Sequence, residues 1–193
     1  PKQLGRQIDR MLGDARADAL VQNFAAQWLG LRQLATINPT STDYDGTLRE
    51  SMRRETQLLF ASILREDRSV LDLLDADYTF VDERLARHYG MAHVEGSRFR
   101  RVPVTDASRR GILGHASVLT LTSAPNRTSV VKRGQWVLET LLGTPPAPPP
   151  PGVEVKLDQP PSPGAAPATL RQRMEQHRTN PSCGACHGVI DPI

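Results

Sequence analysis

The chain has 193 residues, of which 38% are hydrophobic and 23% charged, and a net charge of +3 at pH 7. This composition is typical of a globular protein long enough to bury a core, and no stretch approaches the roughly 20 consecutive apolar residues of a membrane-spanning helix. The basic and acidic residues alternate, as in RESMRRETQ, and aromatic residues make up only 5% of the chain. The sequence therefore argues against a nucleic-acid-binding protein.

Residues 14–31, DARADALVQNFAAQWLGL, predict the first helix. The apolar residues recur at helical spacing, and Asp14 stands where a residue that caps the helix start is expected. One face of this helix should be buried, and its predicted members are Ala19, Leu20, Phe24, Trp28 and Leu31.

Residues 47–67, TLRESMRRETQLLFASILRED, predict a second and longer helix. Thr47 and Glu50 have the spacing of a capping box, in which each side chain satisfies a backbone N–H at the helix start. Arg54 follows Glu50 by four residues, so we expect the two to pair on the solvated face. The buried face is predicted to contain Leu48, Met52, Leu59 and Ile63.

Three shorter elements are expected between residues 69 and 104. A short helix begins near Ser69, and another spans DERLARHYG, with Asp82 as its N-cap and Gly90 as its end. Residues 98–104, RFRRVPV, alternate in character and predict a brief strand.

Of the next two segments, the first has an ambiguous secondary-structure pattern and the second predicts a helix. Residues 111–123, GILGHASVLTLTS, fit a helix or a strand equally, because their apolar run is short. Residues 128–144 predict a helix that Thr128 or Ser129 caps and Gly143 ends. Its expected packing residues are Val131, Trp136, Leu138 and Leu142.

The composition changes sharply after residue 143. Ten of the 16 prolines lie between Pro145 and Pro167. Proline fixes φ and lacks a backbone N–H, so we expect residues 144–168 to be an extended tether and not a packed element. A helix capped by Thr169 and a break at Asn180–Pro181 are predicted after it.

The only two cysteines, Cys183 and Cys186, stand near the end of the sequence, and His187 follows the second. C-x-x-C-H is the attachment sequence of c-type haem. Residues three apart lie on the same side of a helical turn, so both thiols can form thioethers with the two vinyl groups on one porphyrin edge. His187 would then be the proximal iron ligand.

Other chemistries compete for the same residues. A structural zinc site normally has four Cys or His ligands in two spaced pairs, and only one pair occurs here, although His177 and His187 are further ligands of the right type. A thioredoxin-like redox pair needs a βαβ unit, which the proline-rich surroundings do not predict. A plain disulfide gives His187 no role. Haem c is the favoured interpretation, and zinc or a disulfide remains the alternative.

The sixth iron ligand would decide between electron transfer and chemistry at an open iron position. His115 is the favoured distal candidate, and a ligand beyond Ile193 is a further alternative. The other candidates have suitable side chains and no further support: Met11, Met52, His88, Met91 and Met174.

The chain resembles the planctomycete-type cytochrome-associated proteins, which are large bacterial multidomain chains. The stretches that carry the resemblance are FAAQWLGLRQL, LRESMRRETQLLFASILREDRSVLDLLDADYTFVDERLARHYG, RRGILGHASVLTLTSAPNRTSVVKRGQWVLETLLGTPPAPPPPGV and LRQRMEQHRTNPSCGACHGVIDPI. The resemblance implies a mainly α-helical chain, with a helical domain of unknown function at residues 1–107 and a cytochrome-c-like segment at residues 108–193. Members of this family continue past the position of Ile193, so we expect this sequence to be part of a longer protein.

Together, motif and resemblance predict one covalently bound haem c and a role in electron transfer within an exported protein, in the periplasm or at the cell surface. The expected partner is a redox protein or a neighbouring cytochrome module, with no nucleic acid and no transmembrane segment in this chain. Two alternatives remain: a haem enzyme of the oxidase or peroxidase type, and a structural surface module with zinc or a disulfide at the C-x-x-C.

Overall fold

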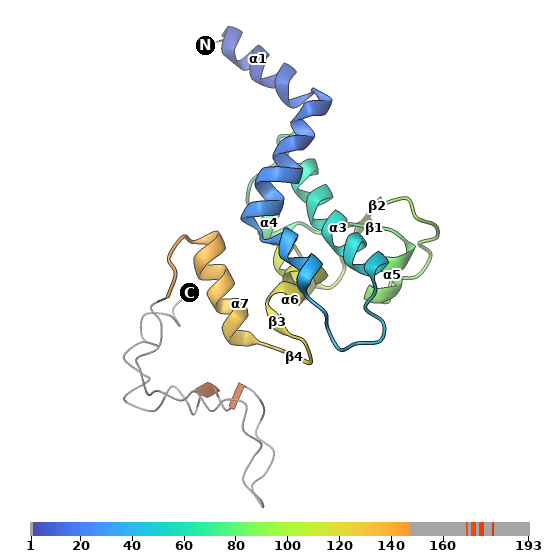
Figure 1. The fold of residues 1–193 in the computed structure, drawn as a ribbon. Helices are drawn as coiled ribbons and strands as arrows, with labels where there is room; N and C mark the ends of the chain where they lie inside the picture. Colours follow the sequence, from blue (N-terminus) through green and yellow to red (C-terminus); the bar gives the residue numbers. More distant parts are fainter. Residues whose placement is uncertain (1, 147–168, 170, 173, 176–178, 180–193) are drawn as a thin grey trace, which may run out of the picture. The chain divides into compact units, whose positions relative to one another are not determined.

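The computed structural model describes residues 2–146 together with 169, 171, 172, 174, 175 and 179. The chain divides into two compact units, Pro1–Gly143 and Thr144–Ile193. The described residues are mainly helical, as the sequence predicted, and include two short antiparallel strand pairs (Figure 1). No helix in this part of the chain has the length and apolar character that a membrane crossing requires.

The N-terminal part is more broken than the sequence predicted. Helix α1, Lys2–Leu12, was not predicted and contains no buried residue. After it come a 3-10 helix η1, Ala15–Ala17, and a π-helix η2, Leu20–Ala25, that leads into α2, Ala26–Trp28. A further 3-10 helix, η3, spans Leu31–Thr36.

The prediction of a single helix at residues 14–31 is therefore wrong in part, and so is the prediction of which residues form its buried face. Leu20 and Phe24 are 44% and 56% exposed, whereas Val21, Ala25 and Leu29 are buried. A π-helix bonds residues five apart, so its faces rotate away from those of a 3.6-residue period. Asp14 does act as a cap, because its carboxylate accepts a hydrogen bond from the Arg16 N–H.

The long helix α3, Gly46–Arg65, forms the centre of the unit. Its predicted buried face is confirmed, since Leu48, Met52, Leu59 and Ile63 are all buried. The cap is Asp45 and not Thr47: the Asp45 carboxylate accepts from the Leu48 N–H at 2.7 Å. Glu50 pairs with Arg53 and not with Arg54.

Two strands flank a short helix beside α3. Strand β1, Tyr78–Val81, pairs antiparallel with β2, Arg100–Pro103, so that Tyr78 faces Pro103 and Val81 faces Arg100. The strand expected at residues 98–104 is thus confirmed, while β1 was not predicted. Helix α4, Asp72–Asp75, precedes β1. Helix α5, Glu83–Tyr89, begins at the Asp82 cap and ends at Gly90, as the sequence predicted.

The remaining elements complete the first unit. Two 3-10 helices, η4 at Ala107–Arg109 and η5 at Ile112–Gly114, lead into α6, Ala116–Leu121, so the ambiguous segment is helical. A small hairpin joins β3, Ser123–Ala124, to β4, Arg127–Thr128. Helix α7, Val130–Trp136, is capped by Ser129 and continues as the π-helix η6, Val137–Leu141.

A close backbone contact explains why residue 111, just before η5, is a glycine. Gly111 has φ 59°, and a Cβ placed there would lie 2.3 Å from the backbone carbonyl of Leu74. Only glycine therefore lets η5 approach the end of α4 so closely.

The core of the unit consists of two apolar clusters. The larger joins η3 and α3 to α6, with Leu29, Leu59, Ile112 and Val118 among its members. Trp28 and Trp136 pack against it, and the Trp28 Nε1–H donates to the Thr140 carbonyl at 2.7 Å. The smaller cluster joins α3, β1, α5 and α6: Leu48, Met52, Val81, Leu85, Ala86 and Ala116.

Candidate functional site

The residues of the predicted haem site, Cys183, Cys186 and His187, lie outside the described residues. Within the part of the chain that the structure does describe, no group of three or more His, Cys, Asp or Glu side chains could hold a metal ion. The distal candidate His115 is described, and it lies in a buried polar network of the first unit.

His115 stands at the start of α6 and is 2% exposed. Its Nδ1 lies 2.9 Å from the Thr56 hydroxyl of α3, which also lies 2.7 Å from the Ser117 hydroxyl. Its Nε2 lies 3.4 Å from the Thr79 hydroxyl of β1. Both ring nitrogens thus face hydroxyl groups of the protein, and iron coordination by His115 would require one nitrogen to leave its partner. Its role as a distal ligand stays a prediction.

Glu55 of α3 is the carboxyl group of this network. Its Oε1 accepts a hydrogen bond from the Thr79 hydroxyl at 2.7 Å, and its Oε2 accepts one from the Tyr89 hydroxyl of α5 at 2.6 Å. Tyr89 in turn accepts from the Ala116 N–H at 2.8 Å. Four elements, α3, β1, α5 and α6, therefore meet at one carboxyl group.

Burial decides the charge of both titratable groups. Removal from water raises the pKa of Glu55 to about 8, and the hydrogen bonds from Thr79 and Tyr89 offset only part of this rise. Burial lowers the pKa of His115 to about 3. The Glu55 Oε1 and His115 Nε2 atoms are 3.9 Å apart. At neutral pH the imidazole is uncharged and the carboxyl is largely protonated, so the two do not form an ion pair.

A cavity of about 280 Å³ adjoins the network. Glu55, Thr79 and Tyr89 line it, and the guanidinium of Arg109 lies 4.9 Å from the centre of the Tyr89 ring. Burial is the main cause that raises the pKa of Tyr89 well above its usual value, so the phenol stays protonated. At neutral pH the Glu55 carboxyl and the Tyr89 phenol that line this cavity are therefore both largely protonated.

Sequence reasoning identified His115 and missed the other members of the network. Glu55 had a usable signal, because it stands three residues after Met52 and four before Leu59 and therefore lies on the buried face of α3. Thr79 and Tyr89 had no such sequence signal, since their hydrogen bonds to Glu55 form only when β1 and α5 pack on α3.

Comparison with known proteins finds matches to two protein families. Residues 1–91 match the family PSD4, described as a protein of unknown function (DUF1592). Residues 109–193 match the family PSCyt3, also described as a protein of unknown function (DUF1588). No curated protein and no solved structure matches the chain. The two matched stretches are thus similar, in this order, to two planctomycete cytochrome-c-associated domains of unknown function, which confirms that much of the predicted resemblance.

Proposed function

We propose that the chain binds one haem c covalently through Cys183 and Cys186, with His187 as the proximal iron ligand, and that it serves in electron transfer. The observation that carries this proposal is the C-x-x-C-H sequence itself, which lies inside the stretch similar to PSCyt3. In the proposed division, residues 1–107 form the helical domain and residues 108–193 the cytochrome-c-like segment, with the tether at 144–168.

The donor set fits haem c. Two thiols three residues apart match the two vinyl groups of the porphyrin, and the adjacent imidazole is a strong iron ligand. Bound haem supplies a one-electron carrier at this position. The protein's own contribution is to attach the porphyrin by two covalent links and to hold the His187 imidazole on one face of the ring.

The first unit, Pro1–Gly143, has the properties of a scaffold for the tether and the C-x-x-C-H sequence that follow it in the chain. Its two apolar clusters and its buried polar network lie entirely within Pro1–Gly143. We assign it a role in docking a redox partner protein or a neighbouring cytochrome module, in the periplasm or at the cell surface.

The test is haem attachment in the exported full chain. The chain is directed to a periplasm that contains cytochrome c maturation enzymes, and its absorption spectrum is recorded oxidised, reduced and as the pyridine derivative after denaturation. We expect haem that remains attached and a derivative typical of two thioether links. Carbon monoxide binding to the reduced protein then reports whether the sixth position is open, as an oxidase or peroxidase would need.

Variants of the motif make the test specific. Cys183→Ala combined with Cys186→Ala should abolish covalent haem, and His187→Ala should lower its yield by about tenfold or more because the proximal ligand is lost. His177→Ala, a histidine outside the motif, is the matched control and should leave the yield unchanged. Exported, folded chain that carries no haem, or haem that survives loss of both cysteines, would refute the proposal.

A further inference from the structure

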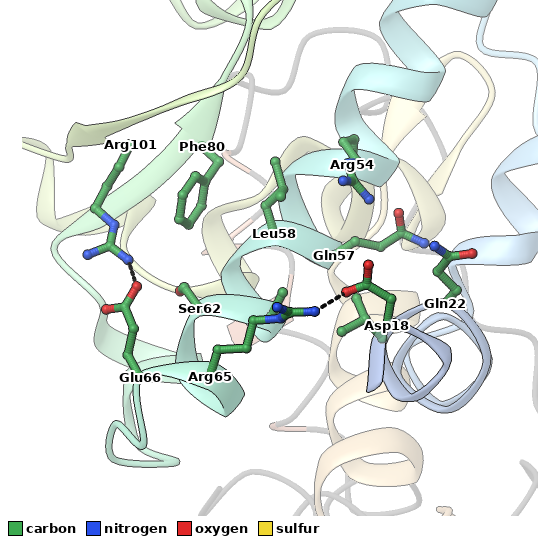
Figure 2. Close-up of a pocket in the computed structure, with 12 residues that line it drawn as sticks. Asp18, Gln22, Arg54, Gln57, Leu58, Ser62, Arg65, Glu66, Phe80 and Arg101 are labelled. Carbon is green, nitrogen blue, oxygen red and sulfur yellow. Dashed lines mark hydrogen bonds and ion pairs between the residues drawn. The ribbon is translucent and has the colours of Figure 1, made fainter. Parts of the chain in front are cut away.

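A second cavity, of about 330 Å³, is lined by residues of α3, of the N-terminal segment and of the β1–β2 pair (Figure 2). Its size falls within the range of small-molecule sites. Figure 2 shows Phe80 and Arg101 of the β1–β2 pair at one end, and Asp18 and Gln22 of the N-terminal segment at the other. Helix α3 forms the wall between them.

Two ion pairs neutralise the acidic groups of this cavity. Arg65 binds Asp18 at 2.7 Å, and Arg101 binds Glu66. Arg101 is further held over the rings of Phe80 and Tyr78, at 5.3 and 4.5 Å from their centres. Neither carboxylate that lines the cavity therefore lacks a cationic partner.

Two hydrogen-bond donors of α3 that line the cavity have no partner among the described residues. Arg54 is half-buried and lines the cavity, and within the described residues its side chain makes neither an ion pair nor a hydrogen bond. Gln57, one turn further, is 1% exposed and also lines the cavity. Its Nε2 has no hydrogen-bond partner among the described residues.

An unpartnered buried amide is unusual, because a protein gains stability when such a group is bonded or replaced by an apolar one. An amide donor and a guanidinium on adjacent turns of one helix are together suited to an oxyanion. The cavity is also lined by the apolar side chains of Leu58, Ala61 and Phe80. An inorganic anion would leave that surface uncovered.

We propose that this cavity binds a small organic carboxylate. Its carboxylate accepts a hydrogen bond from Arg54 and, once the buried Gln57 amide turns toward the cavity, a second one from the Gln57 Nε2. Its apolar body packs on Leu58, Ala61 and Phe80. None of its residues belongs to the C-x-x-C-H sequence, and this proposal does not depend on the proposed electron transfer.

Benzoate is the first probe, titrated into the full chain and followed by calorimetry or by amide chemical shifts. Benzamide has the same shape without the charge, and inorganic phosphate has the charge without an apolar body. We expect benzoate to bind about tenfold or more tightly than either. Equal affinity for benzamide, equal affinity for phosphate, or no benzoate binding would overturn the proposal.

Substitutions on α3 locate the site. Arg54→Gln should weaken benzoate binding by about tenfold. Arg53→Gln removes the same charge from the neighbouring residue, which pairs with Glu50 and does not line the cavity, and it should change the affinity by less than about twofold. Equal losses in the two variants would mean a general charge effect and would contradict the assignment.

Gln57→Met separates binding from folding. If Gln57 is kept for a ligand, the variant should bind benzoate at least about fivefold more weakly while its unfolding temperature without ligand stays the same or rises. A lower unfolding temperature with unchanged benzoate affinity would show that Gln57 serves the fold alone, and would refute its part in the site.

Discussion

Glu55 and His115 show how burial sets the charge of single residues. In the unfolded chain a glutamate titrates near its ordinary value of 4.5 and a histidine near 6.5, whereas burial moves the two pKa values to about 8 and about 3. Folding therefore binds a proton at Glu55 and releases one at His115. Because neither group is charged in the folded state at neutral pH, their separation of 3.9 Å involves no repulsion or attraction between full charges.

The two groups give opposite dependences of stability on pH. The contribution of Glu55 is fully present below pH 4.5 and is lost as pH rises toward 8. The contribution of His115 is fully present above pH 6.5 and is lost as pH falls toward 3. Between pH 4.5 and 6.5 the two slopes cancel, so the pair alone gives a plateau there.

Glu55→Gln should remove the fall in unfolding free energy that the wild-type protein shows as pH rises above 6.5. From pH 6.5 to 8 we expect the wild-type protein to lose about 1–2 kcal/mol of unfolding free energy through Glu55, and the variant to lose little, because glutamine does not titrate. Urea unfolding at several pH values measures the difference. Glu50→Gln, an exposed change on the same helix, is the control. Parallel profiles for wild type and Glu55→Gln would contradict the assigned pKa of Glu55.

At the scale of elements, tight backbone contact fixes how η5 meets α4. Gly111→Ala places a Cβ against the Leu74 carbonyl and imposes φ 59° with ψ −173° on alanine, a region that only glycine adopts readily. We expect a loss of about 2–4 kcal/mol in unfolding free energy, measured by denaturant titration.

Gly96→Ala provides the comparison for the glycine at η5. Gly96 has φ 79°, but a Cβ there would meet nothing within 4 Å, so its substitution measures backbone strain alone. We expect it to cost about 1 kcal/mol. If the two variants lose equal stability, the contact between η5 and α4 is not what excludes a side chain at Gly111.

Elements also show what the sequence can and cannot predict. Helix α5 was predicted because its cap and its apolar spacing agree within one continuous segment. Helix α3 was predicted from its apolar spacing, although its cap is Asp45 and not Thr47. The π-helix η2 was not, since its extra residue per turn leaves no local mark in DALVQNFAAQW. Strand β1 has only four residues and becomes a strand by pairing with β2, from which more than a dozen residues separate it. The cavity lined by Arg54 and Gln57 likewise depends on non-local packing.

At the scale of the whole molecule, the first unit has an apolar core of its own. Both apolar clusters lie within Pro1–Gly143, and so do both tryptophans. A chain of residues 1–143 should therefore fold alone and unfold in a single transition within about 5 °C of the full chain, without haem. Tryptophan fluorescence and circular dichroism during heating test this. A broad, non-cooperative transition would mean that the core needs residues after 143.

The larger apolar cluster joins Leu29 and Leu59, from the stretch similar to PSD4, to Ile112 and Val118, from the stretch similar to PSCyt3. The Trp28 indole likewise donates a hydrogen bond to the carbonyl of Thr140, which lies 112 residues later in the chain. On the ribosome, the first stretch cannot complete its core until the start of the second has left the exit tunnel. A gene rearrangement that separated the two would leave each with an uncovered apolar surface, so we expect selection to keep them adjacent in one reading frame.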